Sequence, residues 1–325
     1  MRWLGGVDIG GTKCAVTLGR ADGESVEIAA KHQFPTPSTP FEALDRFGSS
    51  LAALLEEHPE ARLQAIGISC GGPLDSRAGL ILSPPNLPGW DRIDAVTPLR
   101  ERFGVPVGLQ NDANAGALAE WKWGAGRGTR NMVFLTFGTG MGAGLILDGR
   151  LYAGTNDMAG EVGHIRLEDE GPVGYGKAGS FEGFCSGGGI AQLARRRVQE
   201  AIARGEAPAF CRTPADLAVL TTQQVGMAAR EGDPLALDIF RIVGKKLGQG
   251  LALLVDILNP ERIVIGSIYA RQQPLLEPIV LQTLTEEALP LSLGVCRVVP
   301  AGLGEAVGDL ASLSVAMNAL DAPQA

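Results

Sequence analysis

Two glycine-rich loops, far apart in the chain, have the composition of phosphate-binding turns. The first is Asp8-Ile9-Gly10-Gly11-Thr12-Lys13, and the second is Thr136-Phe137-Gly138-Thr139-Gly140-Met141-Gly142-Ala143-Gly144. Glycine permits positive φ angles and lets a ligand approach main-chain N–H groups without a Cβ in the way. One such loop is an ordinary turn in most proteins. Two of them, both carrying threonine, indicate a phosphate clamp assembled from two parts of one chain.

Two charged side chains of the first loop could complete such a site. Phosphoryl transfer to a hydroxyl needs positioned phosphates, a divalent cation and a base for the hydroxyl proton. Asp8 opens the loop and could hold a hydrated Mg²⁺, directly or through water. Its alternative role is that of a strand-end carboxylate bonded to turn amides. Lys13 could meet a phosphate, and a solvated turn lysine is an equally good interpretation.

Asp112 is the candidate base. It follows the strand-like run Val105–Leu109 and opens a helical segment, and α/β folds place their ligands at such strand ends. Helix capping is the alternative role, because Asn and Asp are preferred N-caps. The two roles are compatible, since a carboxylate at a helix N-terminus stays ionised, as a base must be.

Glu161, His164 and Glu182 form a third group of polar side chains. Carboxylates and imidazole suit the recognition of hydroxyl groups, because they offer donors and acceptors in fixed directions. A site built to bond one particular hydroxyl rejects analogues that lack it. The chain has 3 histidines. We interpret His32 and His58 as solvated. For Glu182 the alternative is a surface carboxylate on a glycine-rich loop.

Short apolar runs of strand type must position both loops. Gly5–Ile9 and Ala15–Leu18 flank the first loop, and Met132–Leu135 and Leu145–Leu147 flank the second. Further strands are expected at Ala65–Ser69, Val105–Leu109 and Arg262–Gly266. Glycine- and proline-rich segments, expected to be loops or weakly periodic, cover 70–90 and 153–189.

Helices are expected between these strands. Thr39-Pro40-Phe41-Glu42 has the pattern of a capping box with proline at the first helical position, and apolar residues then recur at three- and four-residue steps. The other predicted helices are 112–123, 190–204, about 234–258 and 307–320. Alternation of strands and helices predicts an α/β protein.

The composition sets further limits. A chain of 325 residues is long enough for two domains. No run approaches the roughly 18 apolar residues that span a bilayer, and the N-terminal residues do not have the pattern of a signal peptide. The net charge of -8 argues against a nucleic-acid-binding surface. Five dispersed cysteines fit reduced thiols. We therefore expect a cytoplasmic protein without nucleic-acid or membrane partners.

Five motifs resemble those of the ROK (repressor, open reading frame, kinase) family, in its order and approximate spacing. They are Asp8–Lys13, Asn111–Asn114, Thr136–Gly144, Gly160-Glu161-Val162-Gly163-His164 and Ile263–Gly266. The family belongs to the superfamily of sugar kinases, heat-shock chaperones and actin. The resemblance implies two ribonuclease-H-like domains of the actin/hexokinase type with a ligand cleft between them. Residues 1–115, joined by a C-terminal helix at about 306–325, would form one domain, and 116–305 the other.

The resemblance also implies an activity and a set of site residues. It implies an ATP- and Mg²⁺-dependent hexose kinase, most commonly a glucokinase, which we expect to be a homodimer, with Asp112 as the catalytic base. The implied sugar-binding residues are Gly72, Asn86, Asn111, Asp112, Glu161, His164 and Glu182. The implied nucleotide-binding residues are Asp8, Gly10, Gly11, Thr12, Lys13, Thr136, Gly138, Thr139, Gly140 and Gly266, and Asp8 is the implied Mg²⁺ ligand.

One departure from the family concerns zinc. The family usually has a cysteine-rich zinc loop, Cys-x-Cys-Gly-x-x-Gly-Cys-x-Glu, after the motif histidine. Here Val173, Tyr175 and Ser180 stand at the three cysteine positions. A structural zinc site needs about four N or S ligands, and this loop keeps only His164. We therefore predict no zinc site, and expect packing of Tyr175, Phe181 and Phe184 to order the loop that carries Glu182.

Other functions fit less well. The repressor branch carries a DNA-binding region before the first phosphate loop, and only seven residues precede Asp8. A chaperone- or actin-like ATPase would not need Glu161, His164 and Glu182 together. A non-catalytic sugar sensor would not need both phosphate loops and Asp112. The identity of the sugar stays open among glucose, mannose, allose, fructose, N-acetylglucosamine and N-acetylmannosamine, and so do phosphoryl donors other than ATP.

Overall fold

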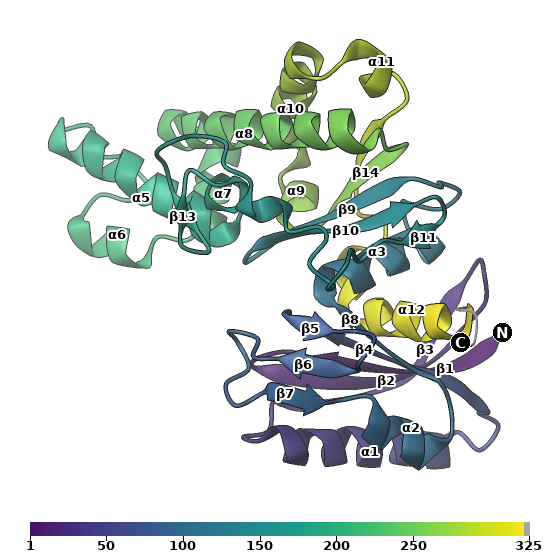
Figure 1. The fold of residues 1–325 in the computed structure, drawn as a ribbon. Coiled ribbons are helices and arrows are strands. Elements are labelled where there is room, and N and C mark those ends of the chain that lie inside the picture. The colour runs from purple at the N-terminus through teal and green to yellow at the C-terminus, as the bar shows by residue number, and fades with distance from the viewer. Residues whose placement is uncertain (322–325) are drawn as a thin grey trace. The chain divides into compact units, whose positions relative to one another are not determined.

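The computed structural model describes residues 1–321, with every side chain except that of Glu305. Contacts between residues divide the chain into two compact units (Figure 1). Unit 1 consists of Met1–Arg130, Gly144–Ala159 and the segment from Gly302 onward, and unit 2 of Asn131–Ala143 and Gly160–Ala301. The domain bounds 1–115 and 116–305 stay a prediction, because compact units need not be independently folding domains.

Unit 1 is built on a five-stranded sheet with the strand order β3-β2-β1-β4-β8. Its strands are β1 (Arg2–Ile9), β2 (Lys13–Ala21), β3 (Val26–Pro35), β4 (Leu63–Cys70) and β8 (Val107–Asn111). β1, β4 and β8 run parallel, whereas β2 pairs antiparallel with both β1 and β3. The carboxyl ends of β1, β4 and β8 therefore lie along one edge of the sheet.

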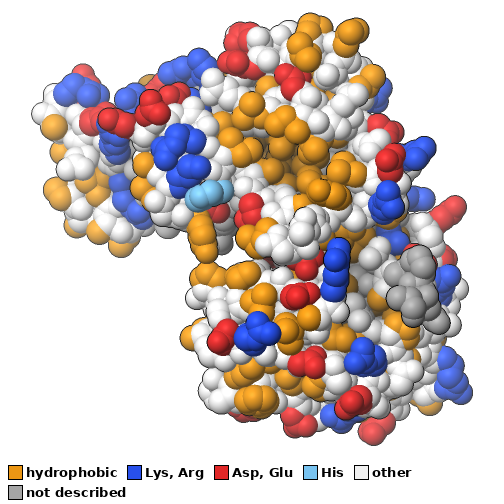
Figure 2. All heavy atoms as spheres, in the orientation of Figure 1, with side chains coloured by type: hydrophobic (Ala, Val, Ile, Leu, Met, Phe, Trp, Pro, Cys, Tyr) orange, Lys and Arg blue, Asp and Glu red, His pale blue; other side chains and the backbone are white. Residues whose placement is uncertain are grey.

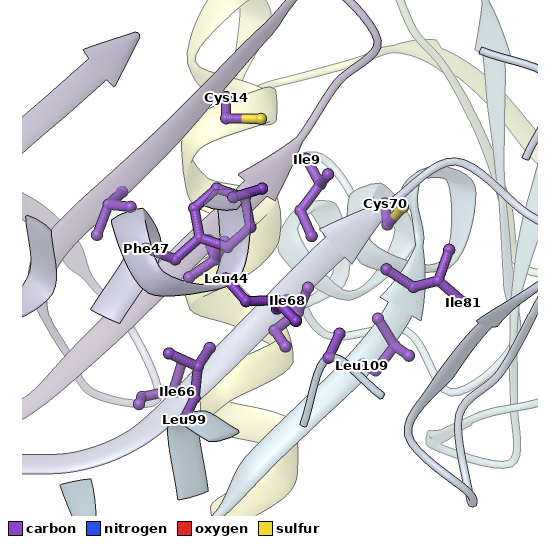
Figure 3. Packing of buried hydrophobic residues seen from close by; sticks show 14 of the residues in the cluster. Ile9, Cys14, Leu44, Phe47, Ile66, Ile68, Cys70, Ile81, Leu99 and Leu109 are labelled. Carbon is purple, nitrogen blue, oxygen red and sulfur yellow. The ribbon is translucent and has the colours of Figure 1, made fainter. Parts of the chain in front are cut away.

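Helices α1 (Pro40–Glu57) and α2 (Thr97–Phe103) lie on one face of this sheet. The predicted capping residue starts α1, because Thr39 Oγ1 accepts a hydrogen bond from Glu42 N at 3.3 Å. Apolar residues of α1, including Phe47 and Leu51, then pack against β1 and β4 residues such as Ile9 and Ile68 in one hydrophobic cluster (Figure 3). The predicted helix and strands are thus confirmed, together with the core that joins them.

Helices α3 (Asp112–Trp123) and α12 (Val307–Asp321) contribute to a second hydrophobic cluster with β1 and β4. A Cβ at Gly67 in β4 would collide with main-chain atoms of Ser312 and Ala316 in α12. Gly6 in β1 is equally close to Ser312. These glycines therefore allow α12 to lie directly on the sheet, and α12 completes the core of unit 1.

A small three-stranded sheet lies within the segment that the sequence indicated as loop. It consists of β5 (Leu74–Asp75), β6 (Leu80–Leu82) and β7 (Asp91–Asp94). The prediction of an irregular segment over 70–90 is wrong there, because strands this short leave no readable period. Ile81 in β6 is fully buried in the same cluster as Ile9, so this sheet belongs to the core of unit 1.

A second five-stranded sheet has the order β11-β10-β9-β14-β15. Its strands are β9 (Met132–Phe137), β10 (Met141–Leu147), β11 (Arg150–Leu151), β14 (Arg262–Ile265) and β15 (Arg297–Pro300). β14 runs parallel to both β9 and β15. The second glycine-rich loop connects β9 to β10, as the first connects β1 to β2.

Unit 2 is otherwise mostly helical. Helix α8 (Pro234–Leu258) has the predicted bounds and packs closely on α10 (Gln273–Glu287), where a Cβ at Gly244 would lie 3.0 Å from Ile279 Cβ. The remaining elements of the described chain are η1 (Val162–His164), β12 (Val173–Gly174), β13 (Lys177–Ala178), α4 (Phe181–Phe184), α5 (Gly187–Ala203), α6 (Pro214–Val219), α7 (Thr222–Arg230), α9 (Ile268–Arg271), α11 (Pro290–Leu293) and η2 (Gly304–Ala306).

The surface carries charges of both signs. Figure 2 shows acidic and basic side chains interspersed over the face in view. Within residues 1–321, every helix is too short or too polar to span a bilayer. The two sheets, both with helices packed on them, make this an α/β protein, as the sequence predicted.

Candidate active site

Three parallel strands of unit 1 bring candidate residues to one edge of the first sheet. In the strand register Asp8 pairs with Ser69, and Cys70 pairs with Asn111. The three neighbouring strands therefore end next to candidate residues: β1 near its end contains Asp8, β4 is followed by Gly71–Pro73, and β8 is followed by Asp112. The pKa of Asp8 is raised by burial, then by Asp309, and also by the Asp112 carboxylate, which lies close enough to act on it. The structure thus groups the predicted metal ligand with the predicted base.

The first glycine-rich loop is fixed by its own main chain and by Thr36. Gly10 N donates to Lys13 O at 3.2 Å, which closes the turn between β1 and β2. Thr36 Oγ1 donates to Gly10 O at 2.6 Å, and Thr36 N donates to Thr12 O at 3.1 Å. Thr12 and Lys13 are exposed. Thr36 is a positioning residue that no local pattern in the sequence indicated.

The surroundings of Asp8 disfavour the ionised form of its carboxyl group. Burial, followed by the neighbouring carboxylates Asp309 and Asp112, raises the pKa of Asp8 from 3.8 to about 6. Lys31 and Lys13 act in the opposite direction. Lys31 also pairs with Asp309, with 2.6 Å between Nζ and Oδ1. A half-buried carboxylate crowded by others is a place where a cation would relieve repulsion.

Asn111, and not Asp112, caps helix α3. Asn111 Oδ1 accepts a hydrogen bond from Asn114 N at 2.7 Å, and Asp112 is the first residue of the helix. The capping alternative for Asp112 is therefore corrected. Asp112 keeps contact with solvent, yet desolvation by surrounding protein atoms raises the pKa of its carboxyl above the usual range, against a hydrogen bond from Ala113 N.

The β6–β7 connection, which carries Asn86, lies beside the first glycine-rich loop and beside the loop after β4. A Cβ at Gly11 would lie 2.5 Å from Asn86 O, and a Cβ at Gly71 would lie 3.3 Å from Asn86 Oδ1. A Cβ at Gly72 would be 4.0 Å from Asn111 Cβ. Asn86 and Gly72, which the sequence placed in the sugar site, thus lie within unit 1 next to the residues assigned to phosphate and to the base.

The second glycine-rich loop is closed by Thr136. Thr136 Oγ1 accepts a hydrogen bond from Gly142 N at 2.9 Å, and Gly138 N donates to Gly140 O at 3.2 Å. Thr139 at the tip is exposed. The loop therefore presents main-chain groups at its tip, as the first loop does, while its threonine hydroxyl holds β9 to β10.

Two neighbours of this loop were not predicted. Gly187 N, at the first position of α5, donates to Gly138 O at 2.7 Å, so a helix N-terminus lies beside the loop. Ser267 Oγ would be 3.6 Å from a Cβ at Gly138, and Ser267 has the positive φ of 57°. The predicted nucleotide residue Gly266 precedes Ser267 and donates from its N to Leu135 O at 3.0 Å. The run Ser186-Gly187-Gly188-Gly189 was the available signal for the helix start.

Glu161, His164 and Glu182 converge through close main-chain packing. A Cβ at Gly163 would collide with Met141 O and would lie 3.2 Å from Glu182 Cβ. Glu182 Oε2 accepts a hydrogen bond from Met141 N at 3.0 Å. Glu161 and His164 are exposed on either side of Gly163. The structure thus groups the three predicted polar residues in unit 2, directly beside the second glycine-rich loop.

The loop that carries Glu182 is held by side chains from two helices. Gln192 of α5 exchanges two hydrogen bonds with the main chain of Val173, both at 3.0 Å. Lys246 of α8 forms an ion pair with Glu168, and its Nζ lies 5.5 Å from the centroid of the Phe184 ring. Phe181 is fully buried against α8, where a Cβ at Gly250 would collide with its ring.

The expected packing role is therefore confirmed for two of three aromatic residues. Phe181 and Phe184 are buried, whereas Tyr175 is 77% exposed. The expectation for Tyr175 is wrong, because this residue lies at the tip of the β12–β13 hairpin. The absence of zinc stays a prediction. Among the residues that the structure describes, none of the His, Cys, Asp and Glu residues form a group of three or more able to hold a metal ion.

Comparison with known proteins identifies relatives over most of the chain. The ROK family profile matches residues 4–317. A glucokinase of Streptomyces coelicolor is 33% identical over 264 residues, which are 80% of each chain. The crystal structure of a ROK family glucokinase from Streptomyces griseus, in complex with glucose and AMPPNP, has a TM-score of 0.74 and 28% identity, and the match covers 97% of this chain and 99% of that one.

Relatives with other functions are also similar. An N-acetylmannosamine kinase of Shigella boydii is 36% identical over 201 residues, which are 61% of this chain and 66% of the relative. The DNA-binding transcriptional repressor Mlc of Escherichia coli is 31% identical over 274 residues, which are 82% of this chain but 63% of the repressor. Two ribonuclease-H-like domains are the architecture of the ROK hexokinases that this structure resembles. The chain belongs to the ROK family and is a sugar kinase.

Proposed function

We propose that this kinase transfers the γ-phosphate of ATP to a hydroxyl of glucose, with Asp112 as the general base. The observation that carries the proposal is the grouping of Asp8, Asp112 and the first glycine-rich loop at the carboxyl ends of β1 and β8, on either side of β4 in one sheet. A base, a cation ligand and phosphate-binding amides are the parts that phosphoryl transfer needs. The similarity to glucokinases supports glucose as the acceptor.

Asp112 suits the base role. Asn111 caps helix α3, so the Asp112 carboxylate is not needed for the cap. Burial raises the pKa of the Asp112 carboxyl, which brings its proton affinity closer to that of an effective general base. Asp112 would accept the proton of the attacking hydroxyl as that oxygen bonds to the γ-phosphorus, while the bond from the γ-phosphorus to the β-phosphate oxygen breaks and ADP leaves.

Asp8 fits the role of a Mg²⁺ ligand. Mg²⁺ is usually held by one or two carboxylates together with water and substrate phosphates. Burial and the nearby carboxylates Asp309 and Asp112 raise the pKa of Asp8, and a divalent cation would relieve the repulsion among these carboxylates. Bound there, Mg²⁺ would neutralise charge on the phosphates of the nucleotide. The main-chain amides of the first loop and Lys13 would orient these phosphates.

The second loop and the polar group of unit 2 complete the proposal. Thr136, Gly138, Thr139 and Gly140 would contact the nucleotide through main-chain donors, and the N-terminus of α5 adds partial positive charge beside them. Glu161, His164 and Glu182 would bond sugar hydroxyls. Asn86, Gly72 and Asn111 would do so from unit 1.

A substrate panel tests this function. Purified protein receives ATP and Mg²⁺ with single hexoses and N-acetylhexosamines, and coupled ADP release gives kcat/KM for each sugar. The highest value for glucose supports the proposal. A higher value for N-acetylmannosamine would reassign the substrate, in line with the Shigella relative. Turnover of ATP without any sugar dependence would contradict a sugar kinase of either kind.

A further inference from the structure

The tip of the β12–β13 hairpin holds a tyrosine in a backbone conformation that tyrosine disfavours. The pairs Val173–Ala178 and Gly174–Lys177 leave a two-residue turn, Tyr175-Gly176, with φ of 43° and 75°. Positive φ at both turn positions is the pattern of a type I′ turn, in which Asn, Asp or Gly is preferred at the first position. A bulky residue there is strained, and strain held at one position is a reason to ask what the residue does.

Tyr175 is also mostly exposed. Its exposed fraction of 77% means that the ring gains little from burial within the described chain. Its ring lies edge-on to that of His164, with 6.4 Å between the ring centroids. The tyrosine therefore carries both strain and exposed apolar surface, beside a residue of the proposed sugar site.

The hairpin is fastened to two residues of that site. Lys177 Nζ donates to His164 O at 2.8 Å. On the other strand, a Cβ at Gly174 would lie 2.8 Å from Glu182 Cβ. The turn between these two anchors consequently has a fixed position relative to both His164 and Glu182. It is an organised part of unit 2.

We propose that Tyr175 is a sugar-binding residue whose ring packs against the C–H face of the hexose held by His164 and Glu182. This inference rests on the proposed function. A pyranose has apolar C–H faces between its hydroxyl groups, and an exposed aromatic ring gains by covering such a surface. An axial hydroxyl on the covered face would point into the ring. Glucose has only equatorial hydroxyl groups beyond the anomeric carbon, so Tyr175 selects for glucose over the epimers whose axial hydroxyl lies on that face.

Two substitutions distinguish the effect of the aromatic ring on sugar binding from the effect of the strained turn on stability. Tyr175→Asn introduces a residue suited to the turn, so it should leave the melting temperature unchanged or raise it by about 1–2 °C. The KM for glucose should rise about tenfold, equivalent to about 1.4 kcal/mol of lost binding, with the KM for ATP within about twofold of the wild type. Tyr175→Phe keeps the ring and should retain glucose KM within about twofold.

A matched control and the epimers sharpen the test. Phe41 in α1 is 74% exposed, so Phe41→Asn removes a similarly exposed ring far along the chain from the site and should change neither KM. The axial hydroxyls of mannose and allose lie on opposite faces of the pyranose ring, so in Tyr175→Asn the preference for glucose should shrink against one of these two epimers and stay unchanged against the other. The proposal is overturned if Tyr175→Asn leaves the KM for glucose unchanged. It is also overturned if Tyr175→Phe raises this KM as much as Tyr175→Asn does.

The proposed function is tested separately, because the wild-type panel comes first. If the wild type prefers another hexose, the same variants are compared on that sugar, and only the assignment of glucose fails. If Tyr175→Asn is then indistinguishable from the wild type, the role of Tyr175 fails while the kinase assignment stands.

Discussion

The Glu182 carboxylate accepts a hydrogen bond from the main-chain N–H of Met141, with 3.0 Å between Oε2 and N. Met141 belongs to the second glycine-rich loop and is also the first residue of β10. A residue proposed to bind sugar is therefore bonded to the loop proposed to bind nucleotide, within one unit. Binding of one substrate at this pair should influence the other.

Substitution of Glu182 tests this link. Glu182→Gln keeps an oxygen that can accept from Met141 N, whereas Glu182→Ala removes it. We expect both variants to raise the KM for the sugar by about tenfold or more, because a bonded hydroxyl loses its charged partner. Only Glu182→Ala should also raise the KM for ATP, by about threefold to tenfold. Steady-state kinetics with each substrate varied in turn would measure both KM values in each variant. Equal KM values for ATP in the two variants would contradict the proposed link between Glu182 and the nucleotide loop.

Asp112→Asn should abolish most turnover without unfolding the protein. The side chain keeps its shape, and Asn111 still caps α3, so the melting temperature should stay within about 2 °C of the wild type. Loss of the base should lower kcat by roughly 10²-fold or more. Single-turnover measurement with saturating sugar and ATP checks this, and turnover near the wild-type value would exclude Asp112 as the base.

The pH profile provides a second test of Asp112. Its pKa is raised, so protonation inactivates the base at a higher pH than for an ordinary aspartate. The acid limb of kcat/KM should therefore lie above about pH 4, with activity falling as pH decreases. An acid limb at or below that value would mean that another group sets the profile.

Asp8 should reduce stability at neutral pH in the metal-free protein. Its folded-state pKa of about 6 exceeds the ordinary 3.8, so the folded chain binds more protons than the unfolded chain between these values. The free energy of unfolding consequently decreases as pH rises through that window. Above about pH 6 Asp8 destabilises the folded protein by its full amount. Asp8→Asn should stabilise the protein by about 1–3 kcal/mol at pH 7.5, after allowance for solvent contact, and by much less at pH 4.5. Thermal unfolding in the presence of chelator measures both, with exposed Asp45→Asn as the control.

Zinc content is directly measurable. Val173, Tyr175 and Ser180 offer no thiolate, and Gln192 and Lys246 hold the loop by hydrogen bonds and an ion pair instead. Elemental analysis of protein purified without a metal-affinity tag should find far less than one zinc per chain. Prolonged chelation should leave the melting temperature unchanged. About one zinc per chain would show that other ligands replace the family's cysteines.

Local patterns were sufficient to predict several elements in both units. The structure has α8 at the predicted bounds Pro234–Leu258, and it shows that Asp233 caps this helix. Asn111-Asp112 marked the start of α3, although the structure assigns the cap to Asn111. Such features are local in sequence, so their physical causes are readable from neighbouring residues.

Features that depend on tertiary contact were not predictable. Helix α5 begins at Gly187, three residues before the predicted start, because glycine disfavours helices in isolation. A Cβ at Gly189 would collide with Gly183 O, so close packing against α4 requires glycine there. The role of Thr36 depends on Gly10, 26 residues away. The exposure of Tyr175 depends on a hairpin too short to leave a periodic signal.

The position of α12 affects the order in which the protein can fold during synthesis. This helix, Val307–Asp321, packs on β1 and β4, which leave the ribosome far earlier. Domains of a nascent chain generally fold as units from the N-terminus. Here the part of the sheet surface that α12 covers, around Gly6 and Gly67, stays uncovered until nearly the whole polypeptide has been made. The N-terminal unit is therefore the last to be completed, and a premature stop before Val307 would remove α12 from a hydrophobic cluster that α3 cannot complete.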